Sequence, residues 1–227
     1  MHQHLIASCT IILALTGSVS AAELTIDYIP RLSLGFTSGL GTTKSEINHQ
    51  FKTVDETVKY EVMPGENIEL PMVVAVRGEG PLYFIAAPAF VYSRNTNKLT
   101  IQTIFSKTVI EDTFTQLGGK FYMGAGWDMT TGWHGELLPY IGLSSVKVES
   151  TLSSNDYFNK TSITTSSSER GTFTIYGITL GGYYTPKSAK RLDVGARVGY
   201  AGASGKIDGI NCDQNGGLVA FEIGWHL

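Results

Sequence analysis

Cysteine is scarce in this chain, and so are long hydrophobic runs. Cys9 and Cys212 are the two cysteines of the 227 residues. Cys9 falls in a segment that we expect to be removed, so an intramolecular disulfide is excluded. Beyond that segment no window reaches eighteen apolar residues, and the longest run, residues 82–91, is broken by Pro88. The chain is therefore not a helical membrane protein. Cys212 lies in a polar stretch, residues 208–216, that predicts a surface loop.

Basic tracts and catalytic motifs are also lacking. The formal net charge is −3, with acidic and basic residues mixed along the chain, which makes nucleic acid an improbable partner. After residue 22 the histidines are His49, His134 and His226, and no His-x-Ser pattern occurs. Metal-ligand spacings, a P-loop and a glycine-rich dinucleotide motif are absent as well. We predict no catalytic, cofactor-binding or metal-binding residue and no cofactor, and hence a protein that is not an enzyme.

The amino terminus carries an export signal. Residues 5–15 form a largely apolar run, and the small residues 19–22 supply a cleavage site, although the first residues contain no Lys or Arg. The run is too short for a membrane-spanning helix that stays in place. We therefore predict a signal peptide over residues 1–22 and a single domain over residues 23–227.

What the chain does contain is two-residue alternation. In residues 219–227, Val219, Phe221, Ile223 and Trp225 alternate with small or polar residues that include Glu222. A tilted strand of about nine to eleven residues crosses a bilayer. With 26 glycines, 11 tyrosines and 10 phenylalanines, the composition is that of an all-β protein.

Eight segments of this kind predict an antiparallel, up-and-down transmembrane β-barrel. The other seven are residues 28–37, 68–77, 82–93, 119–129, 136–148, 173–184 and 192–200. Short connections alternate with four long ones, which are residues 38–67, 94–118, 149–172 and 201–217. Outer-membrane barrels have short periplasmic turns and long extracellular loops in this order.

Two shorter segments leave ten strands as an alternative. Residues 57–63 and 99–105 also look strand-like, but both are short for a bilayer crossing. We prefer eight strands, with these pieces as strand extensions above the membrane. Pro71, Pro88 and Pro139 interrupt three predicted strands, so local bulges are expected there.

The charged residues on the inward positions predict a polar plug. An eight-stranded barrel has an interior just wide enough for side chains, and buried charges of both signs should pair. Glu222 has Arg197 and Arg31 as expected partners on the flanking strands. The inward charges are Arg31, Arg77, Lys120, Asp128, Glu136, Asp193, Arg197 and Glu222. The alternative is that these residues lie on the solvent face of a soluble β-sandwich.

The aromatic residues near the strand ends predict the interfacial girdles of a barrel, with a sugar-binding platform as the alternative. Tyr140 and Tyr183 are included in this interpretation. The principal positions are Trp127, Trp133, Tyr184, Tyr200 and Trp225. Residues 161–168, nearly all Ser and Thr, predict a solvated loop that could meet a receptor.

With these features in place, the chain resembles the small outer-membrane β-barrel proteins of Gram-negative bacteria, the group that contains the membrane domain of outer membrane protein A. The resemblance rests on Leu-Pro-Tyr-Ile-Gly-Leu at residues 138–143, on the strand 192–200 and on the terminal strand. Members of the group usually end in an aromatic residue, whereas this chain ends in Leu227 with Trp225 two positions earlier.

The resemblance implies an integral protein of the cell outer membrane with a structural or surface-interaction role through long extracellular loops. It also implies outer-membrane lipid as a partner, the barrel-assembly machinery as a partner of the terminal strand, and an extracellular ligand whose identity is open. A narrow pore for small solutes and a lipid-modifying enzyme are the alternative functions.

Overall fold

The computed structural model describes residues 24–38, 57–130 and 132–227. The predicted signal peptide, Cys9 and His49 lie outside these ranges. No helix in the described part is long and apolar enough to cross a membrane. The strands are β1 (Thr25–Ser38), β2 (Thr57–Val62), β3 (Gly65–Arg77), β4 (Leu82–Gln102), β5 (Ser106–Thr130), β6 (Trp133–Asp156), β7 (Thr161–Tyr184), β8 (Leu192–Ile207) and β9 (Ile210–Trp225).

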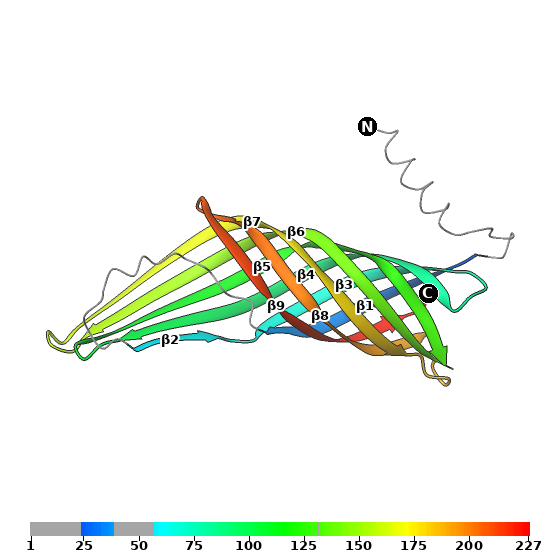
Figure 1. Ribbon diagram of the computed structural model, residues 1–227, viewed down its shortest axis with the longest axis horizontal. Helices are drawn as coiled ribbons and strands as arrows, with labels where there is room; N and C mark the ends of the chain where they lie inside the picture. Colours follow the sequence, from blue (N-terminus) through cyan, green and yellow to red (C-terminus); the bar gives the residue numbers. More distant parts are fainter. Residues whose placement is uncertain (1–23, 39–56, 131) are drawn as a thin grey trace, which may run out of the picture.

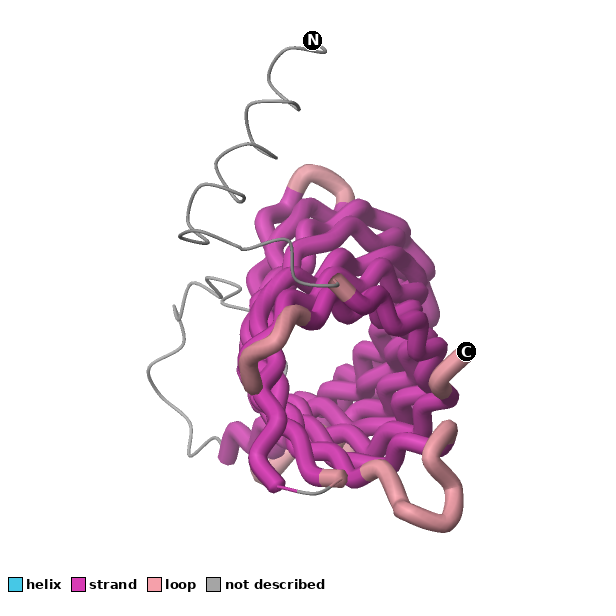
Figure 2. Tube along the Cα trace, turned by 90° about the vertical axis from the view of Figure 1, so that its right-hand side faces the viewer, coloured by secondary structure: helices cyan, strands magenta, loops and turns pink. Residues whose placement is uncertain are grey.

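Eight of these strands close into one antiparallel ring. Along the sheet the order is β2-β4-β3-β1-β9-β8-β7-β6-β5, and β4 also pairs with β5, which joins the two sides. Figure 2 shows the strands surrounding a common axis. The protein is therefore an up-and-down barrel of β1 and β3–β9, as predicted, and not a two-sheet sandwich.

The pairing register gives the barrel its tilt. A path that follows directly paired residues around the ring starts at Phe36 and returns to β1 at Ile26, ten residues earlier. A shift of this kind means that the strands are tilted relative to the barrel axis, typically by about 35–45°. The residues met on the way are Val219, Val198, Leu180, Leu137, Ala125, Phe84 and Val76.

The outside of the barrel is apolar, and most of the side chains that face inwards are buried. On β3 the pattern is a strict alternation, in which Ile68, Leu70 and Met72 are exposed while Glu69 and Val73 are buried. The same alternation exposes large apolar side chains on the other strands of the ring. A belt of this kind around a closed sheet fits the hydrocarbon core of a bilayer, where backbone groups must pair within the protein.

The strand β2 continues the line of β3 beyond Met63 and Pro64. It pairs with residues 97–102 of β4. This is the same edge of β4 along which β3 pairs with residues 83–94. Of the two short predicted segments, residues 57–62 continue the line of β3 and residues 99–102 extend β4, both above the belt, which confirms the eight-strand interpretation.

The predicted long loops are wrong in three of the four cases. Residues 94–118, 149–172 and 201–217 consist mostly of strand, and the turns between them are short: residues 103–105, 157–160 and 208–209. Asp208 and Gly209 both have positive φ, which suits a two-residue hairpin turn. The prediction failed because strands beyond the bilayer can be polar on both faces, so the two-residue alternation disappears while pairing continues. The fourth, residues 38–67, includes residues 39–56, which lie outside the described part.

The bulges expected at proline are not found. Pro71, Pro88 and Pro139 pair with Ala89, Phe121 and Ile178 in an unshifted register. Among the described pairs, the register shifts between Asp128 and Thr130. A strand residue donates its amide to only one neighbour, so a proline removes one hydrogen bond without requiring an extra residue.

Candidate functional site

Two regions stand out as candidate functional sites: the packed interior of the barrel, and the sheet that projects from one end. We call the end at which β1 begins and β9 ends the terminal end, and the opposite one the far end.

Arg31 lies at the centre of a buried charge cluster in the half of the lumen nearer the terminal end. Its Nη1 and Nη2 donate to the two carboxylate oxygens of Glu136 at 2.7 and 2.6 Å. Nη2 also lies 3.2 Å from Asp193 Oδ2, and Nη1 lies 3.8 Å from Glu222 Oε2. The guanidinium lies over the ring of Tyr183, with its central carbon 4.0 Å from the ring centre. One cation from β1 therefore faces three carboxylates from β6, β8 and β9.

A second cluster is built around Glu69 of β3. Its carboxylate accepts hydrogen bonds from Lys120 Nζ at 2.5 Å, from Arg197 Nη2 at 2.8 Å and from the Tyr122 hydroxyl at 2.5 Å. Arg197 Nη2 also lies 2.9 Å from Glu222 Oε1, so Glu222 joins the two clusters. Every member is buried. Because an unpaired charge in such a site is costly, the alternation of cations and anions is what allows the lumen to be filled by ionised groups.

The remaining two predicted charges form a separate pair at the terminal end. Arg77 donates to Asp128 at 2.7 Å and to Asp27 at 2.9 Å. The central carbon of its guanidinium lies 3.7 Å from the centre of the Tyr83 ring. This group is partly exposed to solvent. The structure thus connects six of the eight predicted charges into one network through Glu69, and it sets Arg77 and Asp128 apart.

Glu69 was not among the predicted inward charges, although it bonds to Lys120, Tyr122 and Arg197 in the lumen. Its position in the strand is the signal that identifies it, because Glu69 has the same parity on β3 as Arg77, which is predicted to face inwards. Asp27, the partner of Arg77, is not among the predicted charges, because the predicted first strand starts at residue 28 whereas β1 starts at Thr25.

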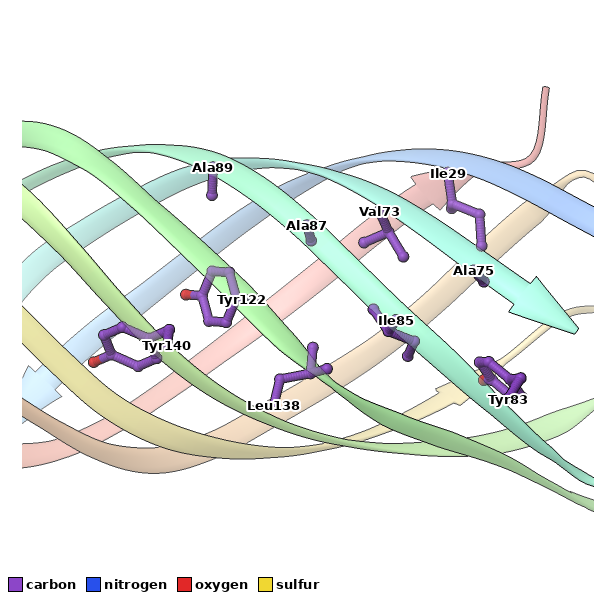
Figure 3. Close-up of a cluster of buried hydrophobic side chains, with 10 residues drawn as sticks. All are labelled: Ile29, Val73, Ala75, Tyr83, Ile85, Ala87, Ala89, Tyr122, Leu138 and Tyr140. Carbon is purple, nitrogen blue, oxygen red and sulfur yellow. The ribbon is translucent and has the colours of Figure 1, made fainter. Parts of the chain in front are cut away.

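Tyr140 and Tyr183 were wrongly assigned to the interfacial girdles. Both are buried in the lumen, as are Tyr83 and Tyr122. Figure 3 shows Tyr122 and Tyr140 within the first of two apolar clusters of the interior. Their parity explains this: Tyr140 alternates in step with Glu136, and Tyr122 with Lys120. The hydroxyl of Tyr183 donates to Glu222 at 2.7 Å, so the phenols help satisfy the buried charges.

The five principal girdle residues lie on the outside of the barrel. Trp127, Trp133, Tyr184 and Trp225 are at the terminal end, where the rings of Trp133 and Tyr184 are 4.9 Å apart. Tyr200 lies further along β8, where it is exposed and pairs with Ile178 and Gly217.

The second apolar cluster fills the lumen towards the far end. Phe173 is its largest fully buried member and lies against Gly205 of the neighbouring strand. Cys212 belongs to this cluster, because it lies in β9 with a buried side chain and not in the predicted surface loop. The other members are Val91, Phe114, Val146, Val148, Ile175, Ala203 and Ile207.

The terminal-end mouth contains a small hollow of about 260 Å³, lined in part by His134, His226 and Arg77. His134 Nε2 lies 3.2 Å from Asp193 Oδ2. The His134 ring stacks on the Tyr183 ring, with the two ring centres 5.3 Å apart. Among the described residues, no group of three or more His, Cys, Asp or Glu side chains is placed to hold a metal ion.

A sheet projects beyond the belt at the far end, built from the extensions of β4, β5, β6 and β7 with β2 at one margin (Figure 1). Its other margin is residues 161–170 of β7, which pair with β6 and, within the described part of the chain, with no second strand. All ten of these residues are exposed. The predicted loop over residues 161–168 is therefore a strand, and it forms an open sheet edge.

The tip of this sheet carries exposed apolar side chains on a turn that is held by side-chain hydrogen bonds. Phe158 is 81% exposed, and Ile104, Phe105 and Tyr157 are exposed beside it. Asp156 accepts hydrogen bonds from the amides of Phe158 and Asn159, at 2.8 and 3.1 Å, and from Asn159 Nδ2 at 2.7 Å. The hydrogen bonds from Asn159 and Phe158 hold the pKa of Asp156 below its usual range.

Comparison with known proteins adds two solved structures of similar type. The chain is similar to the attachment invasion locus protein Ail of Yersinia pestis, with 10% identity, a TM-score of 0.33, and 89% of this chain and 97% of that chain covered. It is also similar to Neisserial surface protein A, with 12% identity, a TM-score of 0.32, and 89% and 98% covered. No family model and no curated protein sequence matches. The barrel fold stands on the closed strand pairing itself.

Proposed function

We propose that this is an integral outer-membrane protein whose barrel is a non-enzymatic scaffold, and whose far-end sheet is displayed at the cell surface. The observation that carries the proposal is the combination of an apolar outer belt with a sheet that continues past it on the side opposite the termini. In outer-membrane barrels the short turns and the termini face the periplasm. The projecting sheet then stands outside the cell.

The packed interior of the barrel supports a scaffold role more than a role as a narrow pore. Side chains from all sides meet in the lumen, with the Arg31 cluster in the half nearer the terminal end, the Glu69 cluster joined to it, and the Phe173 cluster towards the far end. Eight-stranded barrels have room for side chains but not for an aqueous channel. Reproducible single-channel steps from the purified protein would favour the pore, whereas a silent bilayer supports the scaffold.

A lipid-modifying enzyme has less support. Among the described residues the histidines are His134 and His226, and both lie near Asp193 at the terminal end. Thr185 contributes a hydroxyl at this acid, and it donates to Asp193 Oδ1 at 3.1 Å. A serine nucleophile beside an available imidazole is the arrangement that acyl hydrolysis requires, and the contacts around Asp193 serve the lumen network instead.

The projecting sheet supports a role in surface contacts. An open strand edge offers unpaired amide and carbonyl groups to an extended segment of another protein, which adds as a further strand. The hydrogen-bonded turn at the tip adds exposed aromatic side chains, which are common anchors in interfaces. The sheet edge and the tip thus take the place of the long loops that are predicted from the sequence to carry recognition.

Labelling of single cysteines tests the orientation of the protein. In a Cys212→Ser background, Phe158→Cys at the tip should react in intact cells with a polymer-linked maleimide too large to cross the outer membrane. Lys187→Cys, in the exposed turn between β7 and β8, should react only after the outer membrane is permeabilised. The reverse labelling pattern would overturn the proposed orientation. Recovery of the protein without detergent, or the absence of a heat-dependent shift in electrophoretic mobility, would overturn the membrane barrel.

Selection of peptides tests the role of the sheet. Purified protein is panned against a random peptide library, with counter-selection on a variant in which residues 149–168 are replaced by an Asn-Gly turn. We expect peptides rich in β-branched residues that bind the full-length protein and not the shortened one. Proline substitutions at the edge, Thr164→Pro and Ser166→Pro, should abolish their binding. Recovered peptides that bind both proteins equally would count against the sheet as the contact surface.

A further inference from the structure

Three basic side chains lie together on the outer face of the barrel wall, just beyond the belt towards the far end. Lys147 of β6 and Arg170 of β7 are directly paired, and Lys206 of β8 pairs with Thr172, two residues from Arg170. Paired residues have Cβ atoms about 5 Å apart, and diagonal neighbours are about 7–8 Å apart. All three have the parity of the exposed apolar residues on their strands, so they face outwards.

Two of the three basic side chains in this cluster form no ion pair with a described residue, although the acids Glu149 and Asp213 lie on the same outer face. Lys147 donates to Glu149 at 2.5 Å, and the pair is well exposed. Arg170 and Lys206 are also exposed, and neither forms an ion pair with a described residue. Two cationic groups are thus open to an anion on a protein whose net charge is −3.

The surface below the cluster is suited to acyl chains. On the same three strands, towards the terminal end, the outward side chains include Leu143 and Ile141 of β6, Ile178 of β7 and Tyr200 of β8, all exposed. Leu143 lies four residues from Lys147 along β6. The apolar belt therefore continues directly into the basic cluster.

The surface above the cluster is hollowed and polar. A depression of about 440 Å³ is lined by hydroxyl groups of Thr113, Thr151, Ser166 and Ser168 and by the carboxylates of Glu111 and Glu149, together with Ser150 and Ser167. Glu149 and Ser168 are directly paired, each two residues further out than Lys147 and Arg170. Hydroxyl and carboxylate groups around a shallow hollow are what sugar hydroxyls require as hydrogen-bond partners.

We propose that this outer face of β5–β8 is a binding site for a phosphorylated glycolipid of the outer leaflet. The order of the three surfaces matches the order of the parts of such a lipid: acyl chains on the belt, phosphate on Lys147, Arg170 and Lys206, and sugars in the hollow. Basic side chains next to a membrane surface each contribute about 1 kcal/mol to the binding of anionic headgroups. The inference rests on the proposed function, because it needs the far end to face the outer leaflet.

The test compares two variants with the same loss of charge. One replaces Lys147, Arg170 and Lys206 with Gln, and the control replaces Lys187, Lys190 and Arg191 with Gln, which lie in the exposed turn at the terminal end. Binding of purified lipopolysaccharide to the folded, detergent-solubilised full chain is measured by titration. We expect the first variant to bind at least about tenfold more weakly, and the control to bind like the wild type. Enzymatically dephosphorylated lipopolysaccharide should bind the wild type as weakly as the intact lipid binds the variant.

Three results would overturn the proposal: equal binding by all three proteins, an equal loss in the control, or equal binding of the dephosphorylated lipid. Inorganic phosphate that binds as tightly as the lipid would also overturn it, since the belt and the hollow would then contribute nothing. A heat-dependent mobility shift of each protein shows that the barrel is folded. A variant that passes this check and keeps its affinity rejects the site while leaving the proposed outer-membrane scaffold intact.

Discussion

Arg31→Met is expected to lower the free energy of unfolding by about 3–5 kcal/mol. Arg31 is 4% exposed and is the cation nearest to Glu136, which accepts two hydrogen bonds from it, and to Asp193. Its loss leaves these carboxylates buried without their guanidinium partner. The cost comes from the uncompensated charges and not from the loss of an attractive pair in water.

Equilibrium unfolding in urea of the protein folded into lipid vesicles measures this effect. The control is Arg77→Met, which removes two ion pairs of a partly exposed arginine and should cost about 1 kcal/mol or less. The double variant Arg31→Met, Glu136→Met should recover part of the loss, because a carboxylate that needed the cation is gone. If Arg31→Met unfolds at the wild-type midpoint, the lumen network does not stabilise the barrel as described.

Phe173→Ala is expected to cost about 3–5 kcal/mol, since it removes a fully buried aromatic ring from a packed cluster. The ring lies over Gly205, and the other cluster members are held on strands of a closed barrel, so they can move little to fill the space. The cavity should therefore persist, which places the cost in the upper part of the range for such substitutions.

Phe158→Ala is the matched control, because it removes the same ring from an exposed position at the tip. We expect its effect on unfolding to stay within about 0.5 kcal/mol. Both variants are compared in the same urea titration, with the heat-dependent mobility shift as a check that each barrel forms. Equal midpoints for the two variants would show that the apolar cluster near the far end is not part of the stabilising core.

The two-residue alternation was enough to predict the barrel and most of its lumen. Alternation persists where one face meets lipid and the other meets a crowded interior, so parity alone placed Arg31, Glu136 and Glu222 inside. The same rule, applied along β3 and β6, would have found Glu69 and would have moved Tyr140 from the girdle to the lumen. These errors came from assigning aromatic residues by type instead of by position in the strand.

The projecting sheet could not be predicted in this way. Residues 161–170 have no apolar face, because both sides of the strand are exposed, and a Ser- and Thr-rich segment is typical of a loop as much as of a strand. What makes it a strand is its pairing with β6, ten residues in register with a partner that is itself held by β5. Such pairing depends on the barrel below, which holds β6 and β7 side by side.

The sequence by itself determined that this chain forms a closed β-barrel with an apolar exterior and charges inside, because a bilayer permits few other patterns of side chains. The tertiary structure alone decided which charges meet, since partners such as Arg31 and Glu136 are brought together from strands on different sides of the ring. It also decided that the connections become an open sheet, and that Lys147, Arg170 and Lys206 share one face. Register and closure set these contacts, and neither can be read along a single strand.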